Sequence, residues 1–376
     1  MNILLTSAGR RRYLVEYFKE ALGGAGKVFV CNSSPWSTAF SAADGHALSP
    51  LISDPGYIPF LLGYCRENQI SLVLSLFDMD LPVLAGEKGR FAREGVTLVV
   101  SGPEVAAVCN DKWEMFRFLR REGIATPETW VYGFDGDVGG RGRATAGETD
   151  CGTEAMVGTP THVVAKGSVA TAGATEATDM QTGFPLYIKP RWGMGSIGVY
   201  QAFDGNELAA FAGKCRRDIE RSYLRYEAGA DPKRCVIVQE SVDGAEYGLD
   251  VVNDLGGRHQ TTFVRRKLAM RAGETDVAEV IEHKELSRLG EKLAKALGHV
   301  ACLDVDVMEK DGKYYVIDLN ARFGGGYPFS HMAGARLPRA ILHWAQGLEA
   351  DPADLSVSCG GCFCKDIAMR EVVARG

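Results

Sequence analysis

The sequence contains no run of 18 apolar residues, the length that a helix needs to cross a membrane. It also lacks an excess of basic charge, because 42 Lys and Arg residues stand against 48 Asp and Glu residues. No basic run is longer than the three residues Arg10-Arg11-Arg12, which argues against a general nucleic-acid binder. The sequence therefore predicts a protein that binds neither membranes nor nucleic acids.

Features of a secreted protein are also missing. The N-terminal apolar run is too short for a signal peptide, and the positive charges follow the run instead of preceding it. Ten cysteines are scattered without regular spacing, as is typical of reduced thiols and not of a disulfide framework. Cys359, Cys362 and Cys364 could bind metal or cycle redox, but no fourth ligand is evident, which favours a structural role. We therefore expect a cytoplasmic protein.

One segment lacks large apolar side chains. Between Phe134 and Phe184 the sequence has no Phe, Trp, Tyr, Leu or Ile, and Gly, Ala and Thr dominate. Such a segment buries too little apolar surface to offset the entropy lost on ordering it. We interpret residues 136–181 as a flexible insertion, either a plain surface loop or a segment with a regulatory or lid role.

The rest of the sequence has the hydrophobic periodicity of a folded protein. In the first hundred residues, short apolar strands alternate with amphipathic helices, which predicts a parallel sheet covered by helices. From Phe184 onward, strands and helices follow in an α+β pattern. The predicted fold class is therefore α/β followed by α+β. We expect domains at 1–108, at 109–240 with the insertion, and at 241–350, with a C-terminal extension at 351–376.

Residues 193–198, GMGSIG, match the pattern of a glycine-rich nucleotide loop. A dinucleotide-binding loop should open a helix, but the residues after Gly198 have the pattern of a strand. We expect a hairpin that folds over phosphates, with Lys189 on the preceding strand as a point charge. A glycine-rich hairpin with a solvent-facing lysine remains an alternative.

Forty residues further on, an apolar strand ends at Gln239 and Glu240. A purine needs an edge of hydrogen-bonding backbone groups between apolar walls, and the end of a buried strand can supply one. Glu246 follows a glycine turn, where its carboxylate could accept hydrogen bonds from ribose hydroxyls. A solvated loop glutamate is the plainer interpretation of that residue.

Two strands near the C-terminus carry acidic and amide side chains. Asp304 and Asp306 share one face of the first strand, and Asp318 and Asn320 share one face of the second. A two-residue turn between the strands would place an apolar residue opposite Asp306, so we expect a three-residue loop or a bulge that pairs Asp306 with Asp318. Two carboxylates and an amide oxygen suit Mg²⁺ shared with nucleotide phosphates, and a solvated acidic hairpin is the alternative.

The order of these motifs resembles that of the ATP-grasp superfamily, in particular single-module enzymes related to the carbamoyl-phosphate synthase large subunit. The motifs are Lys112 in NDK, Lys189 before the glycine-rich loop, QESVDGAEY, DVDVM and DLNARFGGGYP. The resemblance extends from residue 1 to about residue 345, except for the insertion. It implies an ATP-grasp fold behind an N-terminal pre-ATP-grasp domain. It also implies an enzyme that converts a carboxylate to an acyl phosphate, which an amine captures to give an amide, ADP and phosphate.

The resemblance also implies roles for individual residues. The phosphates of ATP would contact Lys112 and Lys189 and lie under Gly193, Gly195, Ser196 and Gly198. Adenine would contact Gln239, the Glu240 carbonyl and the Val242 amide, and ribose would contact Glu246. Asp306, Asp318 and Asn320 would hold two Mg²⁺ ions, for which Mn²⁺ can substitute, and Arg322 would steady the transferring phosphoryl group. Lys189, Asn320 and Arg322 are thus the expected catalytic residues, and Asp318 stands where many relatives carry glutamate.

The substrates are expected to be a small carboxylate and an amine. Arg265 and Lys267 share one face of a predicted strand and could bind the substrate carboxylate, although a solvated face is an equal alternative. Gly325 and Gly326 would let a substrate loop approach closely, and His331 could lie near the acyl phosphate, although a single histidine is more often structural. Two other functions remain open: an ATP-dependent carboxylase or phosphotransferase, and a silent nucleotide-binding regulator. The sequence also leaves a homodimer open.

Overall fold

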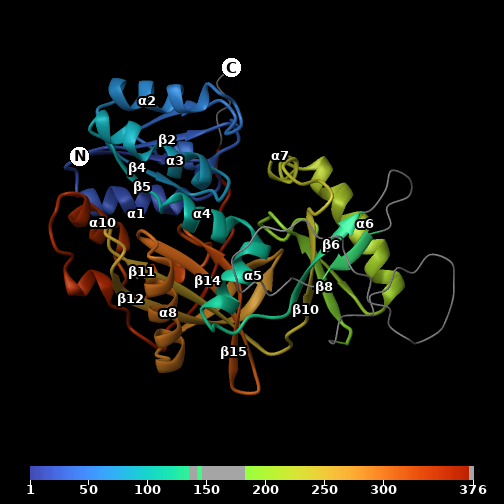
Figure 1. Ribbon diagram of the computed structural model, residues 1–376. Helices are drawn as coiled ribbons and strands as arrows, with labels where there is room; N and C mark the ends of the chain where they lie inside the picture. The colour runs from blue at the N-terminus through green and yellow to red at the C-terminus, as the bar shows by residue number, and fades with distance from the viewer. Residues whose placement is uncertain (135–141, 146–182, 372–376) are drawn as a thin grey trace, which may run out of the picture. The chain divides into compact units, whose positions relative to one another are not determined.

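A computed structural model describes residues 1–134, 142–145 and 183–371 (Figure 1). The chain divides into two compact units. The first unit comprises Met1–Asn110, Arg121–Ala125 and Asp243–Gly376, and the second comprises Asp111–Arg120 and Thr126–Val242. Most of the predicted insertion at 136–181 lies outside the described residues, which include only residues 142–145 of it.

The first unit begins with a parallel sheet in the strand order β3-β2-β1-β4-β5. Its strands are β1 (Asn2–Thr6), β2 (Val28–Asn32), β3 (Gly45–Leu48), β4 (Ile70–Ser75) and β5 (Thr97–Val99). The helices are α1 (Arg12–Leu22), η1 (Thr38–Ser41), α2 (Tyr57–Glu67), α3 (Asp80–Arg93) and α4 (Pro103–Asn110). The predicted parallel, helix-covered sheet is therefore confirmed, and the short edge strand β3 is an addition to it.

The same unit contains an antiparallel sheet in the order β15-β14-β11-β12-β13-β16. Its strands are β11 (Ala245–Asn253), β12 (His259–Arg271), β13 (Glu274–Ile281), β14 (Cys302–Lys310), β15 (Lys313–Asn320) and β16 (Cys362–Cys364). Its helices are α8 (Lys284–Leu297), α9 (Tyr327–Met332), α10 (Leu337–Ala345) and η2 (Pro352–Leu355). Helix α8 packs on β11 and β12, where Gly290 lets it approach the side chain of Thr262.

One apolar core joins the two sheets of the first unit. Phe18 of α1, Ile341 of α10, Phe263 of β12 and Phe323 after β15 all belong to it and are almost completely buried. Burial on this scale stabilises a fold by about 1.5–3 kcal/mol for each large apolar side chain. The parallel sheet and the strands that carry the acidic residues are therefore held as one packed body.

The second unit is built on an antiparallel sheet in the order β7-β6-β10-β8-β9. Its strands are β6 (Thr129–Phe134), β7 (Gly142–Thr145), β8 (Leu186–Pro190), β9 (Tyr200–Ala202) and β10 (Val236–Glu240). Its helices are α5 (Lys112–Arg121), α6 (Gly205–Arg221) and α7 (Arg225–Ala228). Buried side chains of α6, including Leu208 and Ile219, pack with the sheet. Among the described residues of both units, no helix is long and apolar enough to cross a bilayer.

Candidate functional site

The hairpin of β14 and β15 carries the predicted metal ligands. Lys310 pairs with Lys313, so the turn consists of two residues, Asp311 and Gly312, both with positive φ as a tight hairpin turn requires. The register then shifts by one residue at Ile317. The three-residue loop is therefore wrong, and the bulge that we gave as the other solution is confirmed.

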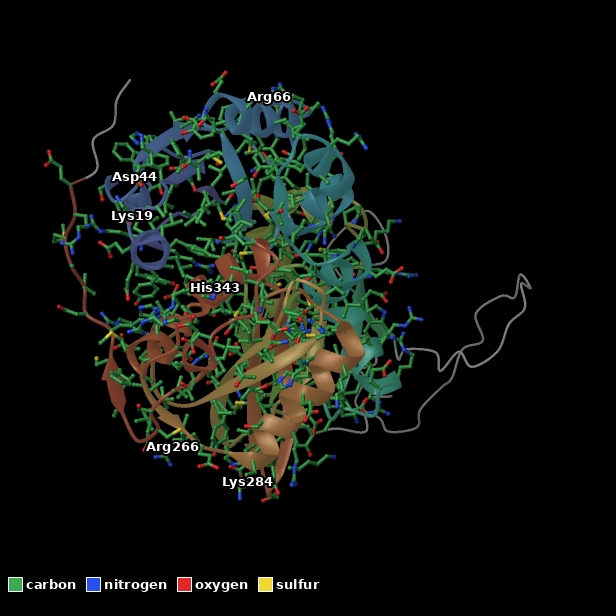
Figure 2. The ribbon with its side chains drawn as sticks, turned by 90° about the vertical axis from the view of Figure 1, so that its left-hand side faces the viewer. Lys19, Asp44, Arg66, Arg266, Lys284 and His343 are labelled. Carbon is green, nitrogen blue, oxygen red and sulfur yellow. The ribbon has the colours of Figure 1, made fainter. Side chains whose placement is uncertain are left out.

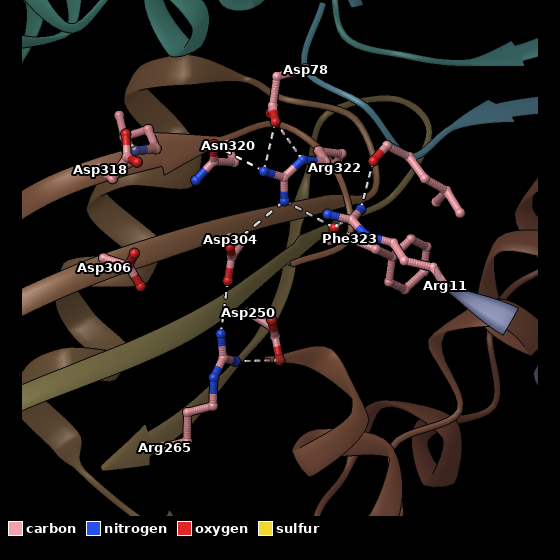
Figure 3. Close-up of polar contacts among 12 residues, drawn as sticks. Arg11, Asp78, Asp250, Arg265, Asp304, Asp306, Asp318, Asn320, Arg322 and Phe323 are labelled. Atoms are coloured by element: carbon pink, nitrogen blue, oxygen red, sulfur yellow. Dashed lines mark hydrogen bonds and ion pairs between the residues drawn. The ribbon is translucent and has the colours of Figure 1, made fainter. Parts of the chain in front are cut away.

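The bulge places Asp306 directly opposite Asp318, and Asp304 directly opposite Asn320. Directly paired residues of an antiparallel ladder project from the same face, with their Cβ atoms about 4.5–5.5 Å apart. The carboxylates of Asp304, Asp306 and Asp318 and the amide of Asn320 therefore lie on one face of the sheet, as Figure 3 shows. We call this surface the acidic face. Burial raises the pKa of the Asp304 carboxyl above its usual range, although the Arg265 guanidinium beside it opposes the shift.

Lys267 of β12 forms an ion pair with one of these acids and with Glu246. Its Nζ atom lies 2.6 Å from Oδ1 of Asp306 and 2.6 Å from Oε1 of Glu246, and its side chain is only 5% exposed. Burial opposes ionisation of Asp306, but the charge and hydrogen bond of Lys267 outweigh it and lower the pKa of that carboxyl. Glu246 is thus ion-paired with Lys267, and its role toward ribose stays a prediction.

Arg265 lies two residues before Lys267 on β12 and points to the same side of the sheet. Its guanidinium is 2.7 Å from Asp250 and 2.7 Å from Asp304, and the side chain is 1% exposed. This burial favours a structural role over contact with substrate. Arg266, between the two, lies on the surface and pairs with Glu279 (Figure 2).

Three glycines give Arg265 and Asp304 the space that they occupy. A Cβ atom at Gly324 would lie 2.1–2.4 Å from the Asp304 carboxylate, and one at Gly326 would lie 2.2–2.3 Å from the Arg265 guanidinium. Gly248 on β11 faces Arg265 in the same way, at 2.6–2.9 Å. Because they have no side chain, these glycines let the backbone pack closely around the ion pairs of Arg265 with Asp250 and Asp304. At Gly325, by contrast, the nearest atoms lie 3.8 Å away, and its predicted contact with substrate stays untested.

Arg322 follows the hairpin and lies at the edge of the acidic face. Its Nε donates to Oδ2 of Asp78 at 2.8 Å, and one terminal nitrogen lies 2.6 Å from the same oxygen. Its other contacts are longer, at 3.1 Å to the carbonyl of Phe323, 3.2 Å to Oδ1 of Asn320 and 3.9 Å to Oδ2 of Asp304. Asp78 and Asp304 raise the pKa of Arg322 against the effect of burial, so the guanidinium remains charged.

His331 lies on α9 and is packed against α1. Its ring stacks on Tyr17 with centroids 3.4 Å apart, and its Nε2 lies 3.7 Å from Glu20. Burial lowers the pKa of His331 to about 4, and the nearby Arg336 reinforces that shift. These contacts account for the histidine as a packing residue, and its proximity to an acyl phosphate stays a prediction.

The donor set suits a magnesium ion that is shared with phosphates. Among the residues that the structure describes, no group of three or more His, Cys, Asp or Glu side chains converges on a metal position. Asp306, Asp318 and the Asn320 amide provide two carboxylates and one neutral oxygen on adjoining positions. Mg²⁺ is typically bound by one or two carboxylates together with substrate phosphates and waters, so this incomplete cage fits it.

The second unit carries the residues predicted to bind phosphates. The glycine-rich segment joins β8 to β9 as a hairpin, and Gly195, Ser196 and Gly198 have positive φ. Successive backbone N–H groups in such a conformation form a concave anion-binding surface. A Cβ at Gly193 would lie 2.9 Å from Pro190, so that glycine permits close packing of the loop on its strand.

The two predicted phosphate-binding lysines also belong to this unit. Lys189 lies on β8 and donates to Oε1 of Gln239 at 2.7 Å. Lys112 begins α5, is 7% exposed, and its backbone N–H donates to the carbonyl of Arg191 next to the glycine-rich loop. Lys112 and Lys189 therefore both adjoin the strand that leads into the loop.

The predicted adenine-binding residues lie at the end of β10. Gln239 is 4% exposed, and its amide nitrogen donates to Oγ1 of Thr129. The carboxylate of Glu240 accepts the backbone N–H of Glu128, and Val242 is almost buried. The side chain of Gln239 therefore has hydrogen-bond partners within the protein. The groups predicted to contact the purine edge are then those of the backbone, the Glu240 carbonyl and the Val242 amide.

The C-terminal cysteines lie beside β13. Cys362 and Cys364 are on β16, and both are exposed, as is Cys359. Within the described ranges these thiols do not converge with His, Cys, Asp or Glu side chains into a group of three or more that could hold a metal ion.

Sequence reasoning missed Arg11, Asp78 and Asp250, which surround the predicted site. Asp78 follows β4, at the carboxyl edge where the strand order reverses between β1 and β4. Polar residues at that point of a parallel sheet are frequent ligand contacts, so the position of Asp78 was a usable signal. Nothing in the sequence pointed to its contact with Arg322, 244 residues away.

Two family models match separate parts of this chain. Residues 3–99 match a family model described as "PylC-like, N-terminal domain". Residues 233–358 match one described as "ATP-grasp in the biosynthetic pathway with Ter operon". The first match covers the parallel sheet, and the second covers strands β11 to β15, including the hairpin that carries the acidic residues, together with β10.

Curated relatives align with part of the chain. Acetyl-CoA carboxylase 2 of Oryza sativa is 27% identical over 192 residues, which are 50% of this chain but 8% of that protein. The carbamoyl phosphate synthase large chain of Caldanaerobacter subterraneus is 21% identical over 183 residues, which are 45% of this chain and 15% of that protein. The aligned segments thus span only a small part of these relatives.

Solved structures share the fold over nearly the whole chain. The biotin carboxylase of Campylobacter jejuni has a TM-score of 0.66 and 16% identity, and the match covers 96% of this chain and 74% of that one. The L-amino acid ligase of Bacillus licheniformis has a TM-score of 0.66 and 18% identity, covering 93% and 76%. At these identities the likeness establishes the fold.

Proposed function

Because this chain belongs to the ATP-grasp superfamily, we propose that it is an ATP-dependent ligase that joins a small carboxylic acid to an amine. ATP, the acid and the amine would give an amide, ADP and phosphate. The observation that carries the proposal is the paired arrangement of Asp306 with Asp318 and of Asp304 with Asn320, with Arg322 at the same edge. Such an arrangement suits the control of charge on a phosphoryl group.

In the first step, an oxygen of the substrate carboxylate attacks the γ-phosphorus, and the bond from that phosphorus to the β-phosphate oxygen breaks. ADP leaves with the electron pair, and an acyl phosphate forms. This step needs positioning and charge neutralisation more than a catalytic base. Arg322 would contact the oxygens of the transferring group, and Lys112 and Lys189 would contact the α- and β-phosphates.

Asp306, Asp318 and Asn320 would hold Mg²⁺, which neutralises charge on the phosphate oxygens when it is bound. The acidic face has more carboxylates than cations. Lys267, Arg265 and Arg322 are its cations, and the carboxylates around them belong to Asp78, Glu246, Asp250, Asp304, Asp306 and Asp318. An added divalent cation would offset that excess. Mn²⁺ is expected to substitute, since it accepts the same oxygen ligands.

In the second step, the amine nitrogen attacks the acyl carbon, and the bond from that carbon to the phosphate oxygen breaks. Phosphate leaves, and the nitrogen loses a proton to complete the amide. Lys267 is the candidate to bind the substrate carboxylate, since its ammonium lies on the acidic face beside Asp306. Gly193, Gly195, Ser196 and Gly198 are proposed to cover the phosphates, and Gln239, Glu240, Val242 and Glu246 to contact the nucleoside.

A carboxylase is the second candidate. The names of several relatives support it, including acetyl-CoA carboxylase and biotin carboxylase. In that case bicarbonate would be the carboxylate that receives the phosphoryl group. A carboxylase domain of this fold from Hydrogenobacter thermophilus is described as a dimer, which supports a homodimer for this chain as well.

The test is a screen for acid-dependent ADP release. The purified chain would be incubated with Mg·ATP, a library of amino and organic acids, and hydroxylamine, which captures an acyl phosphate as a hydroxamate. We expect one class of acid to give equal amounts of ADP and hydroxamate. ADP release that requires bicarbonate would favour the carboxylase. If Mg·ATP raises the melting temperature but no acid or bicarbonate yields ADP, the chain is a nucleotide-binding regulator and the ligase proposal is wrong.

A further inference from the structure

Asp78 belongs to the loop that joins β4 to α3, at the carboxyl edge of the parallel sheet. Its side chain is buried, with 6% of the residue exposed, and its Oδ2 atom takes two contacts from Arg322. A carboxylate that is buried in this way persists only when it is paired, because an isolated charge is costly to bury. Asp78 and Arg322 thus form a buried ion pair.

The contacts of Arg322 divide into a tight set and a loose set. The tight set joins Nε and one terminal nitrogen to Asp78 at 2.8 and 2.6 Å. The loose set consists of 3.2 Å to Asn320, from the same terminal nitrogen that contacts Asp78, and of 3.1 Å to the Phe323 carbonyl and 3.9 Å to Asp304, from the other terminal nitrogen (Figure 3). A phosphoryl oxygen could take over the loose contacts while the tight ones remain in place.

The side chain of Arg11 links the loop that contains Asp78 to the segment that contains Arg322 by hydrogen bonds. One of its terminal nitrogens donates to the carbonyl of Leu76 at 2.6 Å and to the carbonyl of Phe323 at 2.9 Å. Leu76 lies two residues before Asp78, and Phe323 follows Arg322. The backbone on both sides of the ion pair is therefore tied together by one side chain from the start of α1.

We infer that Asp78 is a positioning residue, which holds the Nε edge of the Arg322 guanidinium in place while the longer contacts of the two terminal nitrogens are exchanged for the transferring phosphoryl group. This inference rests on the proposed function, because it concerns the phosphoryl transfer. Through Asp78, the parallel-sheet part of the chain would contribute to the phosphoryl transfer indirectly, by orienting Arg322. Asp78 contacts Arg322 and need not contact substrate.

The test is a double-mutant cycle with Asp78→Ala, Arg322→Ala and the double variant. We expect Asp78→Ala to lower kcat about 100-fold with KM for ATP changed less than about threefold, since a small misplacement of a catalytic group has effects of that size. The double variant should be no slower than Arg322→Ala alone, because Asp78 acts through Arg322. Asp78→Asn keeps one acceptor oxygen and should recover part of kcat.

Asp80→Asn is the matched control. Asp80 is also buried, two residues away, but its carboxylate accepts from Thr6, Ser75 and Tyr57 instead of from an arginine. We expect this variant to lower the melting temperature and leave kcat within about threefold of the wild type. If Asp80→Asn lowers kcat as much as Asp78→Ala does, or if the Asp78 and Arg322 effects on kcat simply multiply, Asp78 has only a structural role and the inference fails.

The same variants separate this inference from the proposed function. If the wild-type protein forms ADP but Asp78→Ala retains its kcat, the inference is wrong and the ligase proposal stands. If no acid supports ADP formation, the proposed function fails. The melting temperatures of the two single variants and the double variant then test whether Asp78 and Arg322 are energetically coupled. Non-additive shifts in the double variant would support the Asp78–Arg322 pair, and additive shifts would overturn it.

Discussion

Asp306 and Asp318 are directly paired on β14 and β15, although the hairpin between them turns on only two residues. The bulge at Ile317 supplies the one-residue shift that this pairing needs. Both carboxylates thereby face the side of the sheet on which Lys267 also lies, 2.6 Å from Asp306. The pairing of these two acids leads to the first prediction.

Replacing Asp318 by Asn should abolish most of the metal-dependent turnover. The substitution keeps the size of the side chain but removes one of the two carboxylates proposed to hold Mg²⁺. We expect kcat/KM to fall at least about 100-fold and the Mg²⁺ concentration needed for half-maximal rate to rise. ADP release measured against Mg²⁺ concentration checks this. Asp311→Asn removes an acid from the turn of the same hairpin, and because Asn tolerates the positive φ there, it should leave activity unchanged.

Replacing Gly324 by Ala should destabilise the protein. The new Cβ would lie 2.1–2.4 Å from the Asp304 carboxylate, so the buried ion pair would have to move. Such overpacking costs about 1–3 kcal/mol. Gly325→Ala is the control, because its new Cβ would meet nothing closer than 3.8 Å and the cost should be below about 0.5 kcal/mol. Denaturant unfolding of both variants measures the difference, and equal stabilities would contradict the role assigned to Gly324.

Replacing Lys189 by Met should weaken the binding of ATP. Loss of one hydrogen bond from a charged donor to phosphate costs about 1.5–3 kcal/mol, which corresponds to about a 10- to 150-fold increase in Kd. Isothermal titration with Mg and a non-hydrolysable ATP analogue measures this. Lys214→Met is the control, since Lys214 lies on α6 and pairs with Asp218 at 3.2 Å. A wild-type Kd for Lys189→Met would remove this lysine from the phosphate site.

Stability should fall in mild acid because of His299. The ring is fully buried, its Nε2 donates to the carbonyl of Val251 at 3.1 Å, and burial lowers its pKa from 6.5 to about 4. The unfolded chain therefore binds a proton that the folded chain excludes. This contribution to stability is fully present above pH 6.5 and is lost as the pH falls from 6.5 toward 4. By pH 5 the loss is about 2 kcal/mol.

His299→Gln isolates that effect. Its amide nitrogen can still donate to Val251, but the side chain does not titrate. We expect the difference in unfolding free energy between the wild type and this variant to change by about 2 kcal/mol between pH 7.5 and pH 5. Parallel pH profiles for the two proteins would show that His299 is not the group responsible.

Much of the fold follows from local patterns in the sequence. The parallel strands read as short apolar runs, and the glycine-rich segment forms the expected hairpin, because β8 pairs antiparallel to β9. The short strand β3, with the sequence GHAL, was missed because four residues with partial burial carry no clear period. The glycines at 325 and 326 predict a loop that continues through the residues after them, 327–331. The structure instead starts α9 at Tyr327 with a proline in its first turn, a position that favours helix initiation.

The site was predictable only in part. The alternation of Asp304, Asp306, Asp318 and Asn320 indicated one shared face, but it could not decide between a longer turn and a bulge. Arg265 and Lys267 were equally good candidates for substrate contact by spacing. The packing around them, with Gly326 against Arg265, is what buries Arg265. Contacts that depend on tertiary packing, such as Asp78 with Arg322, have no local pattern from which they could be inferred.

The bulge also reverses which residues of β15 face the acidic side of the sheet. Val316 pairs with Val307 and is fully buried in the apolar layer, while Asp318 pairs with Asp306 on the opposite face. The two residues are an even number of positions apart, so in a regular strand they would face the same way. A substitution at Val316 therefore tests the apolar core and not the acidic face, although Val316 lies only two residues from Asp318.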